Sequence, residues 1–357
     1  MIIICLLGAA LLCVIGTSVL FIREYAPKHI EYGQVNQVSM GGNYAQGNYV
    51  LVSKSNGIKE FPIIWGDGLY LYDIEKERFY LVKDCKVPLA TFDRGSSATV
   101  QGDKIYYTTG MANPGQDVYM RDISHASKEK VVMQYATHYA VTADHIYYPT
   151  EYGTGERGEI IEKNFKSGEP LVIEKGVFNY MMADEGGLYV YDENKNMVIK
   201  ISLETKEKTY FKDIHATPEW IGSGKGDHVI LIDESGKILD LNGKTGDKRV
   251  AGKVNGRYCS MTNCKYIDPY LFYYNEADEL YRMDLTNGTQ KKILDLASLD
   301  GIGKHSEGTS IGSEINFCTD YIAIETCYET GLEDFPKENR SLLIFDYHGN
   351  LILENEL

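Results

Sequence analysis

Short apolar runs recur along most of the chain, separated by glycine and polar turn residues. The clearest of these runs are rich in Ile and Tyr and begin at Ile105, Ile146, Leu188, Val229, Leu271 and Tyr321, with a weaker copy at Tyr49. The steps between the six clear copies are 41, 42, 41, 42 and 50 residues. A period of this kind is typical of tandem structural repeats.

A second element follows each copy: an apolar pair, two variable positions, a short polar residue, a turn and another strand-like run. The polar residue is always Asp, Asn or Ser, at Asp73, Asp122, Asn164, Ser202, Asn242, Asp284 and Asp346. These side chains can accept hydrogen bonds from the backbone two residues further on and so begin a chain reversal. We therefore interpret the seven residues as turn formers, rather than as metal ligands or catalytic groups.

Further apolar stretches, such as 139–141, 177–182 and 219–221, precede the copies. Each repeat therefore contains three or four short strands in about 40 to 50 residues. After residue 35 no stretch combines helical periodicity with capping residues. Tandem four-stranded repeats predict an all-β fold, a β-propeller over residues 36–357. The polar strand-end residues predict seven four-stranded blades, with six or eight as alternatives.

The repeat resembles the propellers of the low-density-lipoprotein-receptor type, whose blades carry a Tyr-Trp-Thr-Asp element. Ile-Tyr-Tyr-Thr-Thr at 105–109 and Ile-Tyr-Tyr-Pro-Thr at 146–150 look like degenerate versions of it. The chain looks most similar to bacterial exported or membrane-anchored propellers of unknown function. Because the Trp and the strict Asp of the receptor element are missing, the resemblance implies a fold and no ligand. Members of the receptor family tend towards six blades.

The first 22 residues carry no charged side chain and are almost wholly apolar. As a helix, at about 1.5 Å per residue, this segment is ~30 Å long and could cross a bilayer. It predicts a transmembrane anchor, residues 1–22, followed by a linker, residues 23–35. The alternative is a signal peptide cleaved after about residue 18, although the basic start of such a peptide is missing. We expect a single-pass protein of the cell membrane with an extracytoplasmic propeller, or a secreted one if residues 1–18 are removed.

Composition narrows the choice of partner. The chain has 51 acidic and 36 basic residues and a formal net charge of −15, which argues against binding to nucleic acid. Its 28 tyrosines far outnumber its 11 phenylalanines and 2 tryptophans. Tyr suits half-buried strands, so we interpret most of this excess as scaffold.

Motifs for catalysis or cofactor binding are missing from the sequence. It has no phosphate loop, no dinucleotide fingerprint, no His-Glu-x-x-His and no Gly-x-Ser-x-Gly. Cys259 and Cys264 have C-x4-C spacing without a second ligand pair, so zinc is not expected, and the pairing of the seven cysteines stays open. We predict no cofactor, no metal and no catalytic residue from sequence.

Connection lengths point to one side of the ring. The connections between second and third strands are short at 192–196, 234–237 and 275–279, but long at 53–68, 108–117, 149–159 and 325–341. In a closed ring the four long ones are neighbours and, with the link 297–313, would form a crescent on one face. Because loops often carry function, we predict a partner site there. Its candidate contacts are Phe61, Trp65, Tyr152, Tyr328 and Phe335 as aromatic anchors, and Glu151, Glu156, Arg157, His305, Glu329, Glu333 and Asp334 as polar groups.

The sequence thus favours a non-enzymatic, membrane-anchored propeller that binds a protein or carbohydrate partner through one face. One alternative is an extracellular hydrolase or lyase that acts on a polymer or peptide, with its catalytic groups gathered on the face. Another is a sensor or assembly subunit of a membrane complex. For the crescent itself, the alternative is that its loops only pack on each other.

Overall fold

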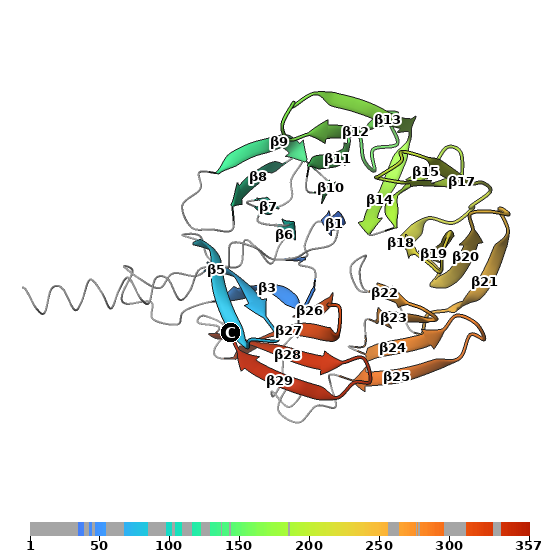
Figure 1. The fold of residues 1–357 in the computed structure, drawn as a ribbon. Helices are drawn as coiled ribbons and strands as arrows, with labels where there is room; N and C mark the ends of the chain where they lie inside the picture. Colours follow the sequence, from blue (N-terminus) through green and yellow to red (C-terminus); the bar gives the residue numbers. More distant parts are fainter. Residues whose placement is uncertain are drawn as a thin grey trace, which may run out of the picture.

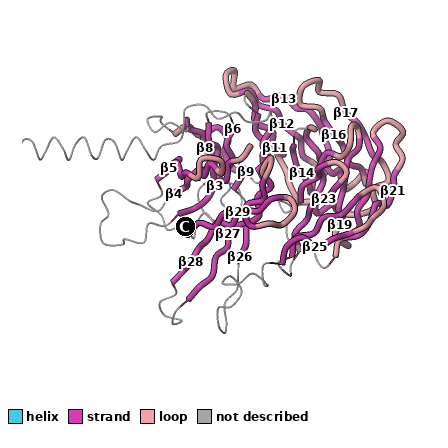
Figure 2. The backbone as a smooth tube through the Cα atoms, turned by 60° about the horizontal axis from the view of Figure 1, so that its bottom comes forward, coloured by secondary structure: helices cyan, strands magenta, loops and turns pink. Residues whose placement is uncertain are grey.

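The computed structural model describes the strands, the short turns and part of the connections. Described are residues 35–38, 43–44, 47–54, 68–84, 98–101, 104–108, 116–122, 129–136, 138–142, 144–184, 186–255, 264–275, 277, 279–295, 312–330 and 337–357. The predicted anchor, residues 1–22, lies outside these residues. Within them there is no helix, and so none that is long and apolar enough to cross a membrane (Figure 2).

Seven sheets stand around a common axis, so the fold is a seven-bladed β-propeller (Figure 1). Each blade is antiparallel and is built from consecutive strands. The first three blades contain β3 (Tyr49–Lys54), β4 (Gly68–Asp73) and β5 (Arg78–Asp84); β6 (Ala98–Gln101), β7 (Lys104–Thr108), β8 (Gln116–Asp122) and β9 (Lys130–Ala136); and β10 (Tyr139–Thr142), β11 (His145–Pro149), β12 (Gly158–Asn164) and β13 (Pro170–Gly176).

Blades 4 to 7 continue the same order. They contain β14 (Phe178–Asp184), β15 (Gly187–Asp192), β16 (Met197–Ile201) and β17 (Lys208–Phe211); β18 (Pro218–Ser223), β19 (His228–Asp233), β20 (Lys237–Asn242) and β21 (Lys248–Lys253); β22 (Cys264–Ile267), β23 (Tyr270–Tyr274), β24 (Glu279–Asp284) and β25 (Gln290–Asp295); and β26 (Gly312–Phe317), β27 (Tyr321–Thr330), β28 (Lys337–Asp346) and β29 (Leu351–Glu356). The prediction of seven blades is confirmed.

Two short strands precede blade 1 along the chain. β1 (Val35–Val38) pairs antiparallel with β10 of blade 3, and β2 (Asn43–Tyr44) pairs in parallel with β6 of blade 2. Among the described residues, the sheet of blade 1 contains β3, β4 and β5, and each of the other six blades has four consecutive strands, as predicted.

The two faces of the ring differ in what connects the strands. One face, here called the turn face, carries the connections from first to second and from third to fourth strands. The other, here called the loop face, carries the connections from second to third strands and the links between blades. In blades 2 to 7 the first strand begins at the loop face.

The seven polar residues predicted from the repeat stand at the ends of the third strands, at the turn face. Asn164 Oδ1, for example, accepts hydrogen bonds from the amides of Lys166 and Ser167 at 2.8 and 3.1 Å. Asp284 Oδ1 accepts one from the Thr286 amide at 2.8 Å. Equivalent bonds are made at Asp73, Ser202, Asn242 and Asp346. The turn-forming role is confirmed at these six positions.

The core lies between neighbouring blades, where large side chains of facing sheets pack. Among the residues that the structure describes, the largest fully buried side chains, less than 2% exposed, include eight tyrosines: Tyr72, Tyr106, Tyr107, Tyr147, Tyr180, Tyr189, Tyr273 and Tyr274. These residues are scaffold, as predicted for most of the tyrosines.

Polar side chains also link one blade to the next. The first residue of the fourth strand donates to a carbonyl of the preceding blade in blades 4, 5 and 6. The donors are Lys208 to Ile173, Lys248 to Lys212 at 2.9 Å, and Gln290 to Lys253 at 2.6 Å. The repeat therefore fixes the spacing of the blades as well as their internal turns.

Within the part of the chain that the structure describes, blades 1 and 7 share no strand and are joined by side chains and by a backbone bond from the Thr319 amide to the Gly47 carbonyl at 3.0 Å. Asn48 Nδ2 donates to Asp320 Oδ2 at 2.9 Å, and Asn48 Oδ1 accepts from the Asp320 amide at 3.1 Å. Asn355 donates to the Tyr72 hydroxyl at 2.8 Å. Beneath these bonds, Val50 and Tyr72 of blade 1 belong to one buried cluster with residues of blade 7 such as Leu342.

Candidate functional site

The loop face is uneven, as the connection lengths predicted. In blades 4, 5 and 6 the second and third strands are joined by short connections, whereas in blade 3 residues 150–157 form a longer loop. In blade 7 the expected loop 325–341 is wrong. β27 continues to Thr330 and β28 begins at Lys337, so most of this segment is strand.

The end of the β27–β28 hairpin extends beyond the rest of blade 7. The pairing of β26 ends at Cys327 of β27, and that of β29 ends at Ser341 of β28. Among the described residues, the register pairs Tyr328–Asn339, Glu329–Glu338 and Thr330–Lys337 therefore form a two-stranded ribbon. We call residues 328–330 and 337–339 the blade 7 ribbon.

The predicted contact residues fall into three groups. Glu151, Tyr152, Glu156 and Arg157 lie together in the loop of blade 3; Tyr328 and Glu329 lie in the blade 7 ribbon; Phe61, Trp65, His305, Glu333, Asp334 and Phe335 lie outside the described residues. Blades 3 and 7 are separated in the ring by blades 1 and 2. The described residues thus bring the first four together and do not join them to the ribbon.

The blade 3 loop folds over the beginning of blade 4. The Gly153 amide donates to the Phe178 carbonyl at 3.0 Å. Tyr152 stacks on His138, with 3.6 Å between ring centroids and 21° between planes. Its hydroxyl is buried, and this burial raises the pKa of Tyr152. Glu151, Glu156 and Arg157 are exposed, so this loop has a packed inner side and a charged outer side.

Three buried polar atoms gather where this loop meets the first strands of blades 3 and 4. They are His138 Nδ1, the Tyr152 hydroxyl oxygen, which faces the Met181 backbone, and Asn179 Oδ1; His138 Nδ1 and Asn179 Oδ1 have no hydrogen-bond partner among the described residues. His138 is 6% exposed, and desolvation lowers its pKa to about 4, so the ring is neutral at pH 7. Buried polar atoms without partners are uncommon and costly.

A β-bulge lies beside this group in blade 4 and another at the same position in blade 5. The register of β14 with β15 shifts at Asn179, and that of β18 with β19 shifts at Glu219. Both residues are half-buried, at the loop-face end of a first strand. The negative charge of Glu219 contributes to the raised pKa of both Tyr152 and Tyr180, so the carboxylate lies near these rings. Bulges of this kind re-aim side chains and are frequent beside functional sites.

We call His138, Tyr152, Asn179 and Glu219 the axial polar group. Tyr152 was predicted as a contact residue, and the other three were not. A signal for two of them exists in the repeat, because Asn179 and Glu219 each interrupt the apolar stretch before a clear copy. The group offers acceptors on Asn179 and Glu219 and mixed donor–acceptor character on Tyr152 and the neutral His138.

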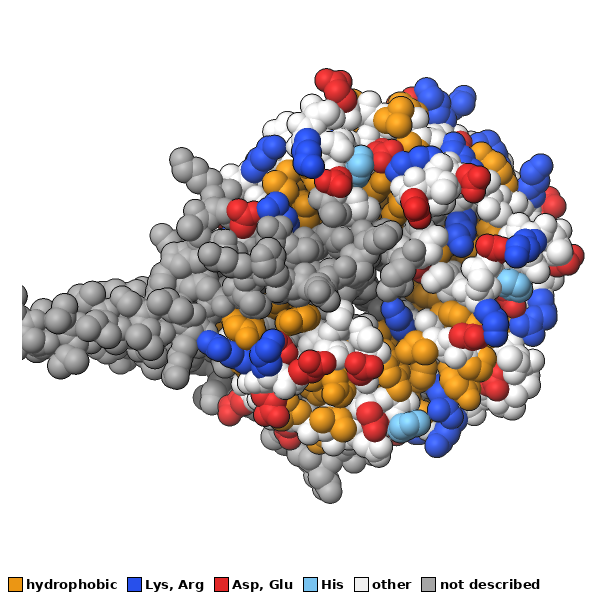
Figure 3. All heavy atoms as spheres, viewed as in Figure 1, with side chains coloured by type: hydrophobic (Ala, Val, Ile, Leu, Met, Phe, Trp, Pro, Cys, Tyr) orange, Lys and Arg blue, Asp and Glu red, His pale blue; other side chains and the backbone are white. Residues whose placement is uncertain are grey.

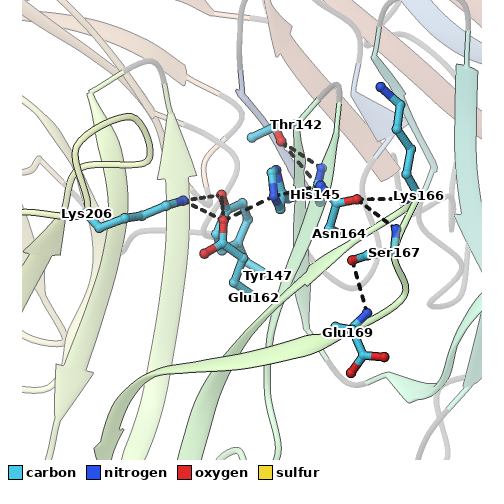
Figure 4. A network of polar contacts seen from close by, with 9 residues as sticks. All are labelled: Thr142, His145, Tyr147, Glu162, Asn164, Lys166, Ser167, Glu169 and Lys206. Atoms are coloured by element: carbon cyan, nitrogen blue, oxygen red, sulfur yellow. Dashed lines mark hydrogen bonds and ion pairs between the residues drawn. The ribbon is translucent and has the colours of Figure 1, made fainter.

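A second polar network lies at the turn face, between blades 3 and 4 (Figure 4). Glu162 is 5% exposed and accepts from Lys206 Nζ at 2.5 Å and from the Tyr147 hydroxyl at 2.9 Å. His145 Nε2 is 3.6 Å from the same carboxylate and 3.0 Å from Asn164 Nδ2. Burial and the Glu162 charge raise the pKa of Tyr147 well above its usual value.

This arrangement has a counterpart in blade 5. His228 and Asp240 occupy the same register positions as His145 and Glu162, and their side chains meet at 2.6 Å. Arg249 Nη2 bonds to Asp240 at 2.9 Å and to the Leu285 carbonyl of blade 6 at 3.0 Å. Since each network reaches the following blade, we interpret both as links between blades and not as reactive centres.

The described part of the chain shows no metal centre. No three His, Cys, Asp or Glu side chains in it gather in a way that could hold an ion. Cys264 and Cys318 are buried, and burial raises the pKa of the Cys318 thiol to about 12. On the face seen in Figure 3, acidic and basic side chains are interspersed around the ring.

Comparison with known proteins places the chain by fold alone. No family model and no curated protein matches the sequence. The computationally designed Ika8 protein is similar over 92% of this chain and 89% of its own, with 10% identity and a TM-score of 0.50. Two further structures are more distant. An oligogalacturonate lyase in complex with manganese has 15% identity and a TM-score of 0.46, over 88% of this chain and 95% of that chain. A nidogen/laminin complex has 12% identity and a TM-score of 0.40, over 72% of this chain and 91% of that chain. The chain is a seven-bladed propeller, and these similarities do not define its activity.

Proposed function

We propose that the protein is a non-enzymatic, extracytoplasmic binding propeller, held at the membrane by residues 1–22, whose loop face binds a protein or carbohydrate partner. The observation that carries the proposal is the unevenness of this face. Blades 4 to 6 have short connections there, while blade 3 adds an ordered loop and blade 7 adds a ribbon. A connection that served only to join two strands could be as short in blade 3 as in blade 4.

The blade 3 loop supports this proposal by its two-sided character. Its inner side is fixed by the stacking of Tyr152 on His138 and by the bond from Gly153 to Phe178. Its outer side presents Glu151, Glu156 and Arg157 to solvent. A loop held in one conformation loses little entropy when a partner binds, so its exposed side chains are suited to recognition.

The charged outer side of the blade 3 loop indicates the chemistry that this part of the face could bind. The exposed carboxylates of Glu151 and Glu156 accept hydrogen bonds and the Arg157 guanidinium donates them, which suits the hydroxyl and amide groups that carbohydrates and peptide backbones both carry. The Glu219 carboxylate and the net charge of −15 make an anionic ligand the less favourable choice.

Photo-crosslinking tests the proposal with a matched pair of positions in blade 3. A benzophenone amino acid replaces Glu156 on the loop face in one variant and Lys166 on the turn face in the other; both residues are exposed. In cells that make the full chain, we expect a discrete adduct of higher mass from position 156 and none from position 166. Adducts from neither position, or from 166 alone, would contradict the proposal.

A further inference from the structure

The directions of β1 and β2 show at which face of the ring the N-terminal end of β1 lies. β1 lies on the channel side of β10, close to β6 and β14, and its register runs from Val35–Thr142 to Val38–Tyr139 (Figure 1). β2 lies beside β6 and β3. The chain therefore passes along the inside of the ring before it forms the first blade.

The direction of this passage follows from the pairing. β10 begins at the loop face, after the link from blade 2, and ends at the turn to β11 on the turn face. Since β1 is antiparallel to β10, it runs from the turn face to the loop face. β2 is parallel to β6, which also begins at the loop face, so β2 runs from the loop face towards the turn face. The N-terminal end of β1, at Val35, consequently lies at the turn face.

We infer that β1 and β2, here called the thread, orient the propeller relative to its N-terminal segment, with the turn face towards the membrane and the loop face away from it. The partner of the loop face is then a macromolecule on the far side of the propeller, and not the lipid surface. The inference rests on the proposed function, because it assigns a partner to that same face.

The turn face itself fits this assignment. Its third-to-fourth turns are short and closed by Asp, Asn or Ser side chains, as at Asn164, Asn242 and Asp346. The linker of residues 23–34 can span at most about 40 Å, at ~3.3–3.6 Å per residue. A segment of this length keeps Val35, at the turn face, within about 40 Å of an anchor formed by residues 1–22.

Cysteine cross-linking tests the thread. Gln37 and Ala140 are register partners, and antiparallel partners have Cβ atoms about 4.5–5.5 Å apart, near disulfide distance. Lys265 is the matched control, because it pairs with Phe272 in blade 6 as Ala140 pairs with Tyr147 in blade 3. We expect the linked peptide at least 10-fold more often from Gln37→Cys with Ala140→Cys than from Gln37→Cys with Lys265→Cys. Equal yields, or no link in the first pair, would overturn the inference.

Energy transfer to labelled lipid tests the orientation. The full chain is reconstituted into phosphatidylcholine vesicles that contain a rhodamine lipid, with a donor dye on Lys166→Cys or on Glu156→Cys; the wild-type chain corrects for native thiols. We expect stronger transfer from position 166. Equal or reversed transfer, or no association with the vesicles, would overturn the inference. Photo-crosslinking at Glu156 reports separately on the proposed function, so the two can fail independently.

Discussion

Replacing Lys206 with Met tests whether the Glu162 network is a link between blades. The change removes the cation that lies 2.5 Å from a carboxylate of a residue only 5% exposed, and leaves that carboxylate with the Tyr147 hydroxyl. Exposed ion pairs contribute about 0.2–1 kcal/mol, and loss of one partner of a buried pair costs about 3–5. Since the Lys206 side chain is 37% exposed, we expect a loss between these limits, about 2 kcal/mol.

Differential scanning calorimetry measures this loss. An unfolding entropy of about 2.1 cal/mol/K per residue over the 357-residue chain converts 2 kcal/mol into a fall in Tm of about 3 °C. Lys166→Met is the control, because Lys166 is 87% exposed and 3.7 Å from Asp144, and it should shift Tm by less than about 1 °C. Adding Glu162→Gln to Lys206→Met should restore part of the loss, since no charge is then buried. An unchanged Tm for Lys206→Met would refute the reasoning and reopen this network as a functional site.

Three further predictions concern stability. The pKa of His138 is about 4 in the folded chain against about 6.5 unfolded, so the unfolded state binds the proton more tightly and stability falls as pH decreases from 6.5 to 4. The loss should approach about 3 kcal/mol, and His138→Phe should remove it in calorimetric scans at each pH. Parallel curves of stability against pH for the wild type and the variant would contradict this. Asn48→Ala should cost about 1–2 kcal/mol and speed amide exchange at Asp320, because it breaks two of the hydrogen bonds that join blades 1 and 7. Unchanged exchange at Asp320 would mean that these two bonds do not hold the ring closed. Asn-Gly in place of residues 328–339 would join the register partners Cys327 and Arg340 by a two-residue turn. It should change stability by less than about 0.5 kcal/mol, since no third strand of the described chain pairs with the blade 7 ribbon. A fall in Tm of several degrees would instead show that the ribbon is part of the scaffold.

Turn chemistry made the fold predictable from the sequence. A side chain such as Asn164 or Asp284 acts on amides two or three residues away, so its role depends on local sequence and recurs with each repeat. The same chemistry also closes the short connections of the loop face, where Asp233 and Asn275 accept backbone hydrogen bonds. Local interactions repeated at a fixed period are the ones that a single sequence reveals.

The candidate site was less predictable, because its features depend on contacts between blades. His138 is one of eight scattered histidines in the sequence, and only the stacking of Tyr152 gives it a distinct environment. The bulges at Asn179 and Glu219 arise from a shift in pairing that no residue type announces. The strands of blade 7 were also missed beyond residue 325, since this segment lacks an alternation of apolar and polar residues.

The sequence does not predict β1 as a strand, and the boundary between the predicted linker and the predicted propeller falls inside it. The reason is that β1 is held by its pairing with β10, which is a long-range contact. Its four residues are held at register positions more than a hundred residues away in the chain. A four-residue segment has no periodicity long enough to identify as a strand. Whether residues 1–22 form an anchor stays a prediction of the sequence.

The antiparallel pairing of β1 with β10 also has a mechanical consequence. A tension transmitted through residue 34 towards the turn face would act along the strand, at right angles to the backbone hydrogen bonds between Val35–Val38 and Tyr139–Thr142. All of these bonds would then bear the load together in shear, instead of opening one after another as they would if β1 were peeled sideways. Four residues would in this way give the blades a stiffer attachment than their number suggests, and a pull on the N-terminus would reach blade 3 before any other part of the ring.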